Sequence, residues 1–544
     1  MRRPMFLAVA GAAASMAALG AYGLVVRPWY RAWGVDPAEK DRLLPGDELL
    51  AMPTGVETRG ITIEAPAPAI WPWLVQMGYG APAGTATTRS TCAAPAPTRS
   101  SRSGSTWPPA RPLPPAVRPR WRSLRPMTTD TTAPGPLGAP GAAAPAAGPR
   151  DRAPLAERAL AERVRSVPPS GIRRFFDILA TMDDVISLGV GEPDFDTPER
   201  ITAAGIRSLH AGRTHYTSNY GTAELRRALA DHLERRYGVR YDSATELLVT
   251  VGASEAVDLA LRATCDPGDE VILHEPSYVA YVPAVVFAGG TVRHVATRLE
   301  DDFALDPTAV EATITPRTKA LFLGYPCNPT GAVLPDDVQD ELAAIAERHD
   351  LLVYSDEIYD RLAYGTYRHR AFSALPGMRG RTILMGGFSK AYAMTGWRVG
   401  WLAAPAAILE GIVKVHQYGI MSAPTTAQDA ALEAILHGEA DVERMRAEYD
   451  RRRRLLVDGL NALGLRTFEP RGAFYAFPEV GSATGLSSDE FAEALLREER
   501  VAVVPGSAFG PSGEGHVRAC YATAYEQLED ALVRIGRFVD RHRA

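Results

Sequence analysis

The chain has 544 residues, of which 46% are hydrophobic and 23% are charged, the composition of an ordinary soluble globular protein. Its formal net charge of −5 offers no basic surface for nucleic acid. The four cysteines are scattered and form no CxxC pair, so they predict neither a zinc site nor a disulfide framework. We therefore expect no metal and no nucleic-acid partner, and a main body that resides in the reducing cytoplasm.

Two unlike segments open the chain. Residues 5–26 form an uncharged run that is long enough to cross a bilayer as a helix. This run predicts a membrane anchor whose orientation stays open, because arginines flank both of its ends. Residues 27–80 contain ETRGITIEAPAPAIWPWLVQMG, which predicts a strand followed by a helix. This piece resembles the start of polyketide cyclase and START-like domains, so a membrane-anchored START-like binding protein is one alternative.

Residues 81–126 change character and are rich in Pro, Ser, Thr and Arg, which is typical of a disordered linker. A second interpretation comes from the genetic code. Moving the reading frame back by one base lets the codons of residues 81–88 encode an aromatic-rich continuation of the START-like segment. We therefore expect that a frameshift joins two genes and that Met127 starts the second protein. Residues 127–159 are predicted to be a disordered leader.

From about residue 160 onward, short β-rich runs alternate with longer helical ones. Strands are predicted at 247–251, 270–274, 319–324, 351–355, 382–387 and 399–403. This alternation predicts an α/β fold with a largely parallel sheet flanked by helices. Ligands of such sheets bind beyond the carboxyl ends of the strands, so polar residues at those ends are the candidates for a site.

The predicted strand ends carry such residues. Gly252-Ala253-Ser254 opens a helix whose free N–H groups can hold a phosphate. Each motif at these strand ends, Gly252-Ala253-Ser254 included, is on its own also typical of a turn or a helix cap, and only their joint placement indicates a site. The residues that follow the later strands are Tyr278, Asn328, Asp356, Tyr359, Ser389, Lys390 and Arg398.

Lys390 is one of four lysines in a chain with 55 arginines. An arginine stays protonated and cannot act as a nucleophilic amine, whereas a lysine can lose its proton when it is desolvated and form a Schiff base. The retention of a lysine at a strand end therefore indicates a chemical role.

Residues 160–540 resemble the class I/II aminotransferases of the fold-type-I, pyridoxal-phosphate-dependent superfamily. The motifs that carry the resemblance are SLGVGEPDFDTP, THYTSNYGTAELRRAL, VTVGASEA, EPSYVAY, YPCNPTG, YSDEIY, GGFSKAYAMTGWRVGW and VRACYATA. The resemblance implies a large cofactor domain over residues 200–425 and a smaller α+β domain from 160–199 and 430–544. The segments 471–480 and 501–510 are predicted to be strands of the smaller domain.

The resemblance also implies a role for each candidate. Lys390 would form the Schiff base with pyridoxal 5′-phosphate and carry the substrate proton. Asp356 would keep the pyridine nitrogen protonated, which makes the ring an electron sink. Tyr359 and Asn328 would bond the phenolic oxygen of the ring, and Tyr278 would stack on its face.

Further roles concern the phosphate and the substrate. Arg518 would take the substrate α-carboxylate as a two-point fork, a geometry that lysine cannot reproduce. Gly191 would let the backbone approach the substrate. Tyr216 would reach the phosphate of a neighbouring subunit, which implies a homodimer. The residues expected to hold the phosphate within the chain are Ala253, Ser254, Ser389 and Arg398. The chain departs from many relatives at Gly387, where they place a serine hydroxyl on the phosphate.

The expected reaction moves an amino group between an L-amino acid and a 2-oxo acid. Aspartate, aromatic amino acids and N-acetyl-diaminopimelate stay open as donors, with 2-oxoglutarate as an acceptor. A carbon–sulfur β-lyase on the same fold is the main alternative. A transcription regulator with an aminotransferase-like domain would need a winged-helix module upstream, and residues 1–150 contain no such pattern.

We predict that residues 1–126 are dispensable for catalysis, because the START-like resemblance ends before such a domain could close its core. A chain that begins at Met127 should be dimeric and as active as the full chain, and it should be more soluble. The measurement is specific activity and cofactor content of both chains in mild detergent. A substantial loss of either quantity in the shorter chain would show that the N-terminal region is part of the enzyme.

Overall fold

The computed structural model of the chain describes residues 159–168, 182 and 184–544. The predictions made for residues 1–158 lie outside this part, including the membrane helix at 5–26, the START-like segment and the linker. Within the described residues, no helix is both long enough and apolar enough to cross a membrane.

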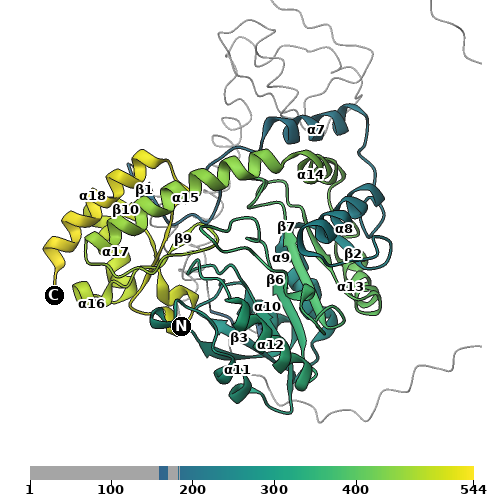
Figure 1. The fold of residues 1–544 in the computed structure, drawn as a ribbon, viewed down its shortest axis with the longest axis horizontal. Helices are drawn as coiled ribbons and strands as arrows, with labels where there is room; N and C mark the ends of the chain where they lie inside the picture. The colour runs from purple at the N-terminus through teal and green to yellow at the C-terminus, as the bar shows by residue number, and fades with distance from the viewer. Residues whose placement is uncertain (1–158, 169–181, 183) are drawn as a thin grey trace, which may run out of the picture. The chain divides into compact units, whose positions relative to one another are not determined.

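A seven-stranded sheet forms the centre of the described chain (Figure 1). Its strands are β2 (Leu247–Thr250), β3 (Glu270–Glu275), β4 (Thr291–Ala296), β5 (Thr318–Leu323), β6 (Leu352–Asp356), β7 (Thr382–Gly387) and β8 (Gly400–Ala403). They lie in the order β2-β8-β7-β6-β5-β3-β4. Strand β8 is antiparallel to both of its neighbours, and the other pairs are parallel. The predicted α/β fold with a largely parallel sheet is therefore confirmed.

All six strands predicted for this sheet are present, with ends that differ by at most one residue. The strand that the sequence did not predict is β4. It lies at the edge of the sheet and Val295 is its one buried residue, so its mixture of Thr, Arg and His carries neither a continuous apolar run nor a clean alternation.

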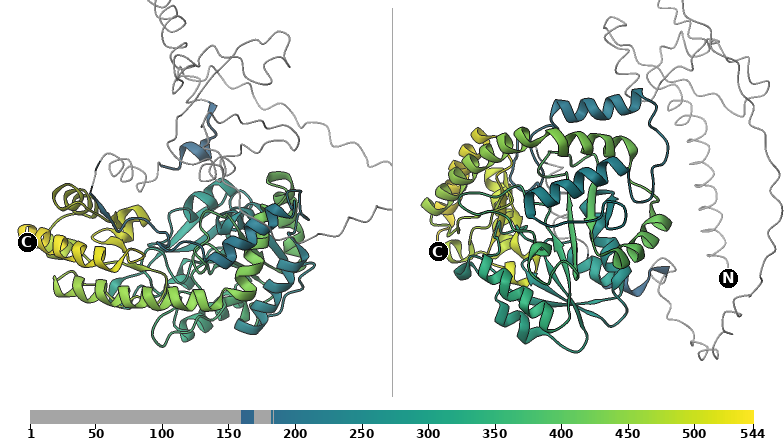
Figure 2. Two further views of the ribbon diagram at one scale, coloured as in Figure 1. Left: turned by 90° about the horizontal axis from the view of Figure 1, so that it is seen from above. Right: turned by 45° about the vertical axis from the view of Figure 1, so that its right-hand side comes forward.

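Helices cover both faces of the sheet (Figure 2) because alternate residues of each strand are buried on opposite sides. On one face Leu273, Phe322 and Tyr354 belong to the core that includes α9, α10 and α13. On the other face Ile272 and Leu321 pack with α11 and α12, while α7, α8 and α14 cover the β2 side. These helices are α7 (Glu199–His210), α8 (Ala223–Tyr237), α9 (Gly252–Thr264), α10 (Tyr281–Ala288), α11 (Pro307–Thr313), α12 (Asp336–Arg348), α13 (Ala406–Gly419) and α14 (Thr425–His437), with the 3-10 turns η3 (Leu299–Asp301) and η4 (Phe372–Ala374).

A second group of strands lies beside the C-terminal helices. In it β9, β12 and β11 form an antiparallel three-stranded sheet, and β1 pairs with β10 in parallel. The strands are β1 (Ile186–Ser187), β9 (Tyr475–Ala476), β10 (Val501–Ala502), β11 (Val504–Pro505) and β12 (Val517–Cys520). The helices of the remaining chain are α5 (Glu162–Arg165), α15 (Glu439–Ala462), α16 (Gly481–Thr484), α17 (Ser488–Glu499) and α18 (Tyr525–His542), with η5 (Gly506–Phe509) and η6 (Pro511–Gly513).

The strands of this second group are shorter than predicted. Only Tyr475–Ala476 of the segment 471–480 is a strand. The segment 501–510 divides into two 2-residue strands, and Gly506–Phe509 forms a 3-10 turn instead. The division into a large and a small domain stays a prediction.

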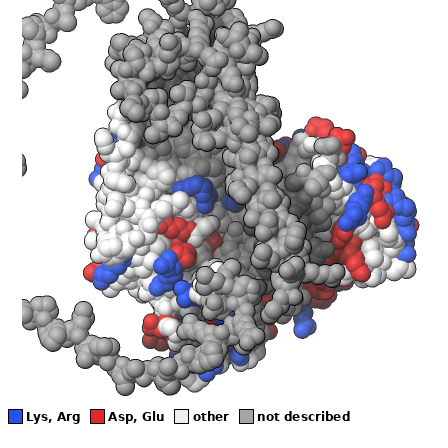
Figure 3. Space-filling model, turned by 180° about the vertical axis from the view of Figure 1, so that it is seen from behind, with Lys and Arg blue, Asp and Glu red and all other residues white. Residues whose placement is uncertain are grey.

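Charged side chains of both signs are interspersed on the described surface that Figure 3 shows, in line with the small net charge. Many of them form ion pairs, such as Arg541 with Glu498 near the end of α18. Exposed pairs of this kind contribute little to stability.

The fold brings the start of α9 against β8. A Cβ atom at Gly400 would lie 2.6 Å from the backbone nitrogen of Ala253 and 2.6 Å from the carbonyl carbon of Gly252. The absence of a side chain at Gly400 therefore allows the first turn of α9 to rest directly on this strand.

We predict that Gly400→Ala lowers the free energy of unfolding by about 1–3 kcal/mol, because the added methyl group forces β8 and α9 apart. The matched control is Gly411→Ala inside α13, where an added Cβ meets nothing within 4 Å. That change should raise the free energy of unfolding by about 0.5–1 kcal/mol through helix propensity. Urea denaturation of both variants measures the difference, and equal stability of the two would contradict the packing argument.

Candidate active site

Lys390 follows β7 and is the described lysine that forms no ion pair. Its Nζ donates a hydrogen bond to the carbonyl oxygen of Gly191 at 2.7 Å. Burial lowers the pKa of this lysine from 10.5 to about 8. The other lysines in the described residues, Lys319 and Lys414, pair with surface carboxylates. Lys390 is thus the amine best able to lose its proton near neutral pH.

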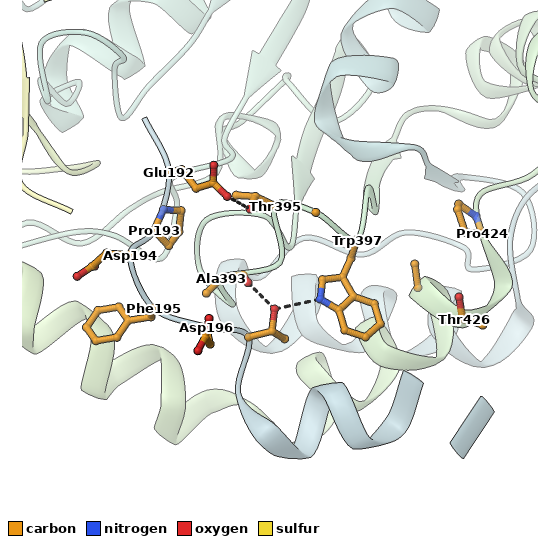
Figure 4. A pocket seen from close by; sticks show the side chains of 13 residues that line it. Glu192, Pro193, Asp194, Phe195, Asp196, Ala393, Thr395, Trp397, Pro424 and Thr426 are labelled. Carbon is orange, nitrogen blue, oxygen red and sulfur yellow. Dashed lines mark hydrogen bonds between the residues drawn. The ribbon is translucent and has the colours of Figure 1, made fainter. Parts of the chain in front are cut away.

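The loop that supplies this carbonyl is clamped to the turn after the lysine. Thr395 donates to Glu192 at 2.5 Å, and the hydroxyl of Thr197 both donates to the carbonyl of Ala393 at 2.6 Å and accepts from the Trp397 indole at 3.0 Å (Figure 4). These bonds hold residues 192–197 against residues 393–397. The two segments also line a cavity of about 530 Å³, which none of the predicted site residues lines.

Asp356 ends β6 and is a buried carboxyl group that has no cationic partner among the described residues. Its Oδ2 accepts a hydrogen bond from the hydroxyl of Tyr281 at 2.9 Å, and its Oδ1 accepts one from the backbone N–H of Ile358 at 3.2 Å. Burial raises its pKa to about 6. It forms no ion pair with any residue in the described part of the chain, so a cation brought to this carboxylate would be strongly favoured.

Tyr281 is a site residue that the sequence interpretation missed. It starts α10, three residues after Tyr278, and the two rings meet edge to face with centroids 5.5 Å apart. A Cβ atom at Gly324 would lie 2.8 Å from the Tyr281 hydroxyl, so the glycine makes room for the ring. The available signal was the spacing of the two tyrosines in EPSYVAY, which places both near the start of one helix.

Arg518 of β12 is a buried guanidinium that pairs with no carboxylate in the part of the chain that the structure describes. Its Nη1 donates to Oδ1 of Asn328 at 2.9 Å, and its Nη2 donates to the carbonyl of Gly189 at 2.7 Å. Its Nε has no hydrogen-bond partner among the described residues. The group also lies over the ring of Tyr475, 4.6 Å from the centroid. A buried cation that bonds only neutral acceptors is suited to receive a carboxylate.

Tyr359 lies next to these residues and forms a hydroxyl pair. Its oxygen is 2.8 Å from the hydroxyl oxygen of Tyr475. Burial raises the pKa of Tyr359 well above its ordinary value, so its hydroxyl keeps its proton and can act as a donor. Tyr475 is the second site residue that the sequence interpretation missed, because the segment GAFY predicted only a strand.

The first turn of α9 forms a cationic cradle together with Arg398. Gly252 has a positive φ of 74°, and a Cβ atom there would lie 2.5 Å from the Arg398 guanidinium. Arg398 donates to the carbonyl of Thr395 at 3.0 Å and pairs with no carboxylate in the described chain. Ala253 is half-buried and Ser254 is exposed on the same turn. The helix dipole and the guanidinium together favour an anion here.

The remaining predicted residues differ in their placement. Ser389 is buried directly before Lys390. The side chain of Tyr216 is 81% exposed, and it makes no hydrogen bond with any described residue. At Gly387 a Cβ atom would lie 3.0 Å from Cδ1 of Ile358 and 3.3 Å from Cα of Gly400. This tight packing gives a physical reason for the missing serine, because a side chain would displace its neighbours.

Most of the described chain is similar to known proteins. Residues 183–535 match the family model of aminotransferase class I and II. An aspartate aminotransferase of Pyrococcus abyssi is 47% identical over 379 residues, which cover 69% of this chain and 97% of that protein. Aromatic-amino-acid aminotransferase 2 of Thermococcus litoralis is 45% identical over 379 residues, with the same coverage. The crystal structure of an aromatic aminotransferase from Pyrococcus horikoshii has a TM-score of 0.65 at 46% identity, covering 68% of this chain and 99% of that one.

We predict that Lys390→Met stabilises the cofactor-free protein at pH 7 by about 1–3 kcal/mol at ~1.4 kcal/mol per pKa unit. The pKa of Lys390 in the folded protein is about 8. Below this pH the lysine is protonated in both the folded and the unfolded protein, so the folded protein bears the full free-energy cost of a buried charge. As pH rises from about 8 toward 10.5, the folded lysine releases its proton and this cost fades. Urea denaturation between pH 7 and 10 should therefore show a shrinking difference. A difference that does not change with pH would contradict the assignment.

Proposed function

The chain belongs to the class I and II aminotransferases, and we propose that it transfers the amino group of an L-amino acid to a 2-oxo acid with pyridoxal 5′-phosphate as its cofactor. The observation that carries this proposal is the set of buried or enclosed charges that no residue in the described chain neutralises. These charges belong to Lys390, Asp356 and Arg518.

The donor set fits this cofactor group by group. The buried Asp356 carboxylate would gain its missing cation from a protonated pyridine nitrogen. Arg398 would bind the phosphate together with Ser389 and the first turn of α9, where Ala253 and Ser254 lie. When bound, the cofactor supplies an electron sink that stabilises negative charge on the substrate α-carbon.

Lys390 would act as both the attachment point and the proton carrier. Its lowered pKa makes a neutral Nζ available near pH 8, and the carbonyl of Gly191 keeps this nitrogen in place. A neutral Nζ can take the proton from the substrate α-carbon and later return one. Asp356, which Tyr281 and the Ile358 N–H hold in position, would keep the ring nitrogen protonated during this transfer.

Arg518 would bind the α-carboxylate of both substrates. Asn328 and Gly189 occupy one N–H of each terminal nitrogen and so fix the plane of the guanidinium, while Nε keeps an unused N–H. Tyr359 and Asn328 would bond the phenolic oxygen of the cofactor, and Tyr278 would stack on the ring. Together these contacts would fix the substrate relative to Lys390.

We further propose that two chains form a homodimer in which Tyr216 of each reaches the phosphate bound by the other. The 81% exposure of the Tyr216 side chain supports this role, because the residue is free to meet a second copy. The proposed location of the enzyme is the cytoplasm. The names of the two relatives support aspartate or an aromatic amino acid as donor. We propose 2-oxoglutarate as the acceptor.

The test is to trap the cofactor on the protein. The purified enzyme should be yellow, and borohydride should attach the cofactor to the peptide that contains Lys390. The Lys390→Ala variant should lose turnover and the label, because it loses both the attachment point and the proton carrier. Label on Lys319 or Lys414 would refute the assignment.

Activity toward a panel of L-amino acids with 2-oxoglutarate identifies the donor. Cystathionine serves as the control substrate, since release of pyruvate from it would indicate a carbon–sulfur lyase. Amines without a carboxylate should react far more slowly than amino acids, because they cannot use Arg518.

A further inference from the structure

Tyr475 lies at the meeting point of the groups that bind substrate and cofactor in the proposed function. Its ring is under the Arg518 guanidinium, and its hydroxyl is 2.8 Å from that of Tyr359. A Cβ atom at Gly191 would lie only 2.6 Å from the Tyr475 hydroxyl. One buried side chain thus touches the proposed carboxylate-binding arginine, a proposed cofactor-binding phenol and the loop that holds Lys390.

The strand register explains this position. Tyr475 of β9 lies opposite Cys520 of the antiparallel β12. Arg518 precedes Cys520 by two residues and therefore projects from the same face of the sheet as Tyr475, as its diagonal neighbour. The arginine is enclosed on another side by Phe509, whose ring centroid is 5.0 Å from the guanidinium.

We propose that Tyr475 is a positioning residue for the transamination, with separate tasks for its ring and its hydroxyl. The ring supports the Arg518 guanidinium in the orientation that receives the substrate α-carboxylate. The hydroxyl donates to the oxygen of Tyr359, so that the single proton of Tyr359 points at the phenolic oxygen of the cofactor. This inference rests on the proposed function.

The proton count of the two hydroxyls supports this direction. Each hydroxyl has one proton to donate and lone pairs to accept. Either oxygen of the pair can be the donor in the chain alone. Once Tyr359 donates to an anionic oxygen, its own oxygen can only accept from Tyr475. Consecutive hydrogen bonds in one direction polarise and strengthen one another, so the Tyr475 hydroxyl makes Tyr359 the better donor.

The groups around Tyr359 and Tyr475 leave both hydroxyls neutral and bonded to each other. The groups whose charges act on them are Arg518, Cys520 and Tyr278. Burial raises the pKa of Cys520 to about 11 and also raises that of Tyr278, so neither titrates between pH 6 and 9. In this range a change in the absorbance of the bound cofactor therefore does not arise from these neighbours.

The experiment compares Tyr475→Phe with Tyr475→Leu in the cofactor-loaded enzyme. A hydrogen bond donated to the cofactor oxygen stabilises its proton-poor form and lowers the pKa that the visible absorbance reports. Tyr475→Phe should therefore raise this spectral pKa by roughly 0.5–1 unit, the scale of one hydrogen bond. The loss of the hydroxyl should also lower kcat ~5- to 10-fold. KM should stay within about twofold, because the phenylalanine ring still supports Arg518.

Tyr475→Leu should shift the spectral pKa by the same amount and also raise KM for the amino acid and the oxo acid about tenfold, because the ring is lost. The matched control is Tyr364→Phe, which removes a buried hydroxyl bonded to the carbonyl of Ala473. In the described chain the ring of Tyr364 meets Tyr521 and Arg453, and it forms no hydrogen bond or ring contact with Arg518 or Tyr359. This control should leave both the spectral pKa and KM as in the wild type.

Two results would overturn the inference: a spectral pKa of Tyr475→Phe within about 0.2 unit of the wild type, or a KM increase in that variant as large as the one in Tyr475→Leu. Tyr475→Phe keeps the volume of the side chain, so it decides the matter even where the leucine variant does not fold. A wild-type enzyme that never turns yellow would instead refute the proposed function.

Discussion

A buried charge without a partner is costly, and the site of this protein contains several. Within the described residues, Asp356 bonds only neutral donors, and Arg518 bonds only neutral acceptors. The neutral hydrogen bonds from Tyr281 and to Asn328 orient the two charges without cancelling them. The ion pairing that the site lacks is left for its ligands to supply.

The fold assembles this site from three separate parts of the chain. The parallel strands β6 and β7 end at Asp356 and Gly387, so Asp356 and the turn with Lys390 both lie at the carboxyl ends of the strands. Strand β12 of the second sheet supplies Arg518. The segment before α7 contributes the carbonyls of Gly189 and Gly191, each bonded to one of the cationic side chains. Each of the three parts therefore supplies groups of the site that the other two do not supply.

The sequence predicted most residues at strand ends but not those that support them. Lys390 and Asp356 stand out because their chemistry is unusual at those places in the chain. Tyr281 and Tyr475 do not, because a tyrosine in an apolar segment is equally typical of a core, and only the tertiary structure brings their hydroxyls to Asp356 and Tyr359. Strand β4 was missed for a related reason, since this strand has one buried residue and thus no apolar pattern of its own.

The hydrogen bond between Lys390 and Gly191 has a consequence for the order in which amines occupy the site. A carbonyl oxygen does not distinguish between one ammonium group and another, and accepts from whichever is nearest. When the lysine nitrogen is engaged elsewhere, the Gly191 carbonyl becomes a vacant acceptor held in place by the clamp between Thr395 and Glu192. In the proposed function, the nitrogen of an arriving amino acid would then take the position that the lysine nitrogen has left. The same backbone atom would thus hold the enzyme's own amine and then the substrate's in turn, so that the two exchange places on one fixed point.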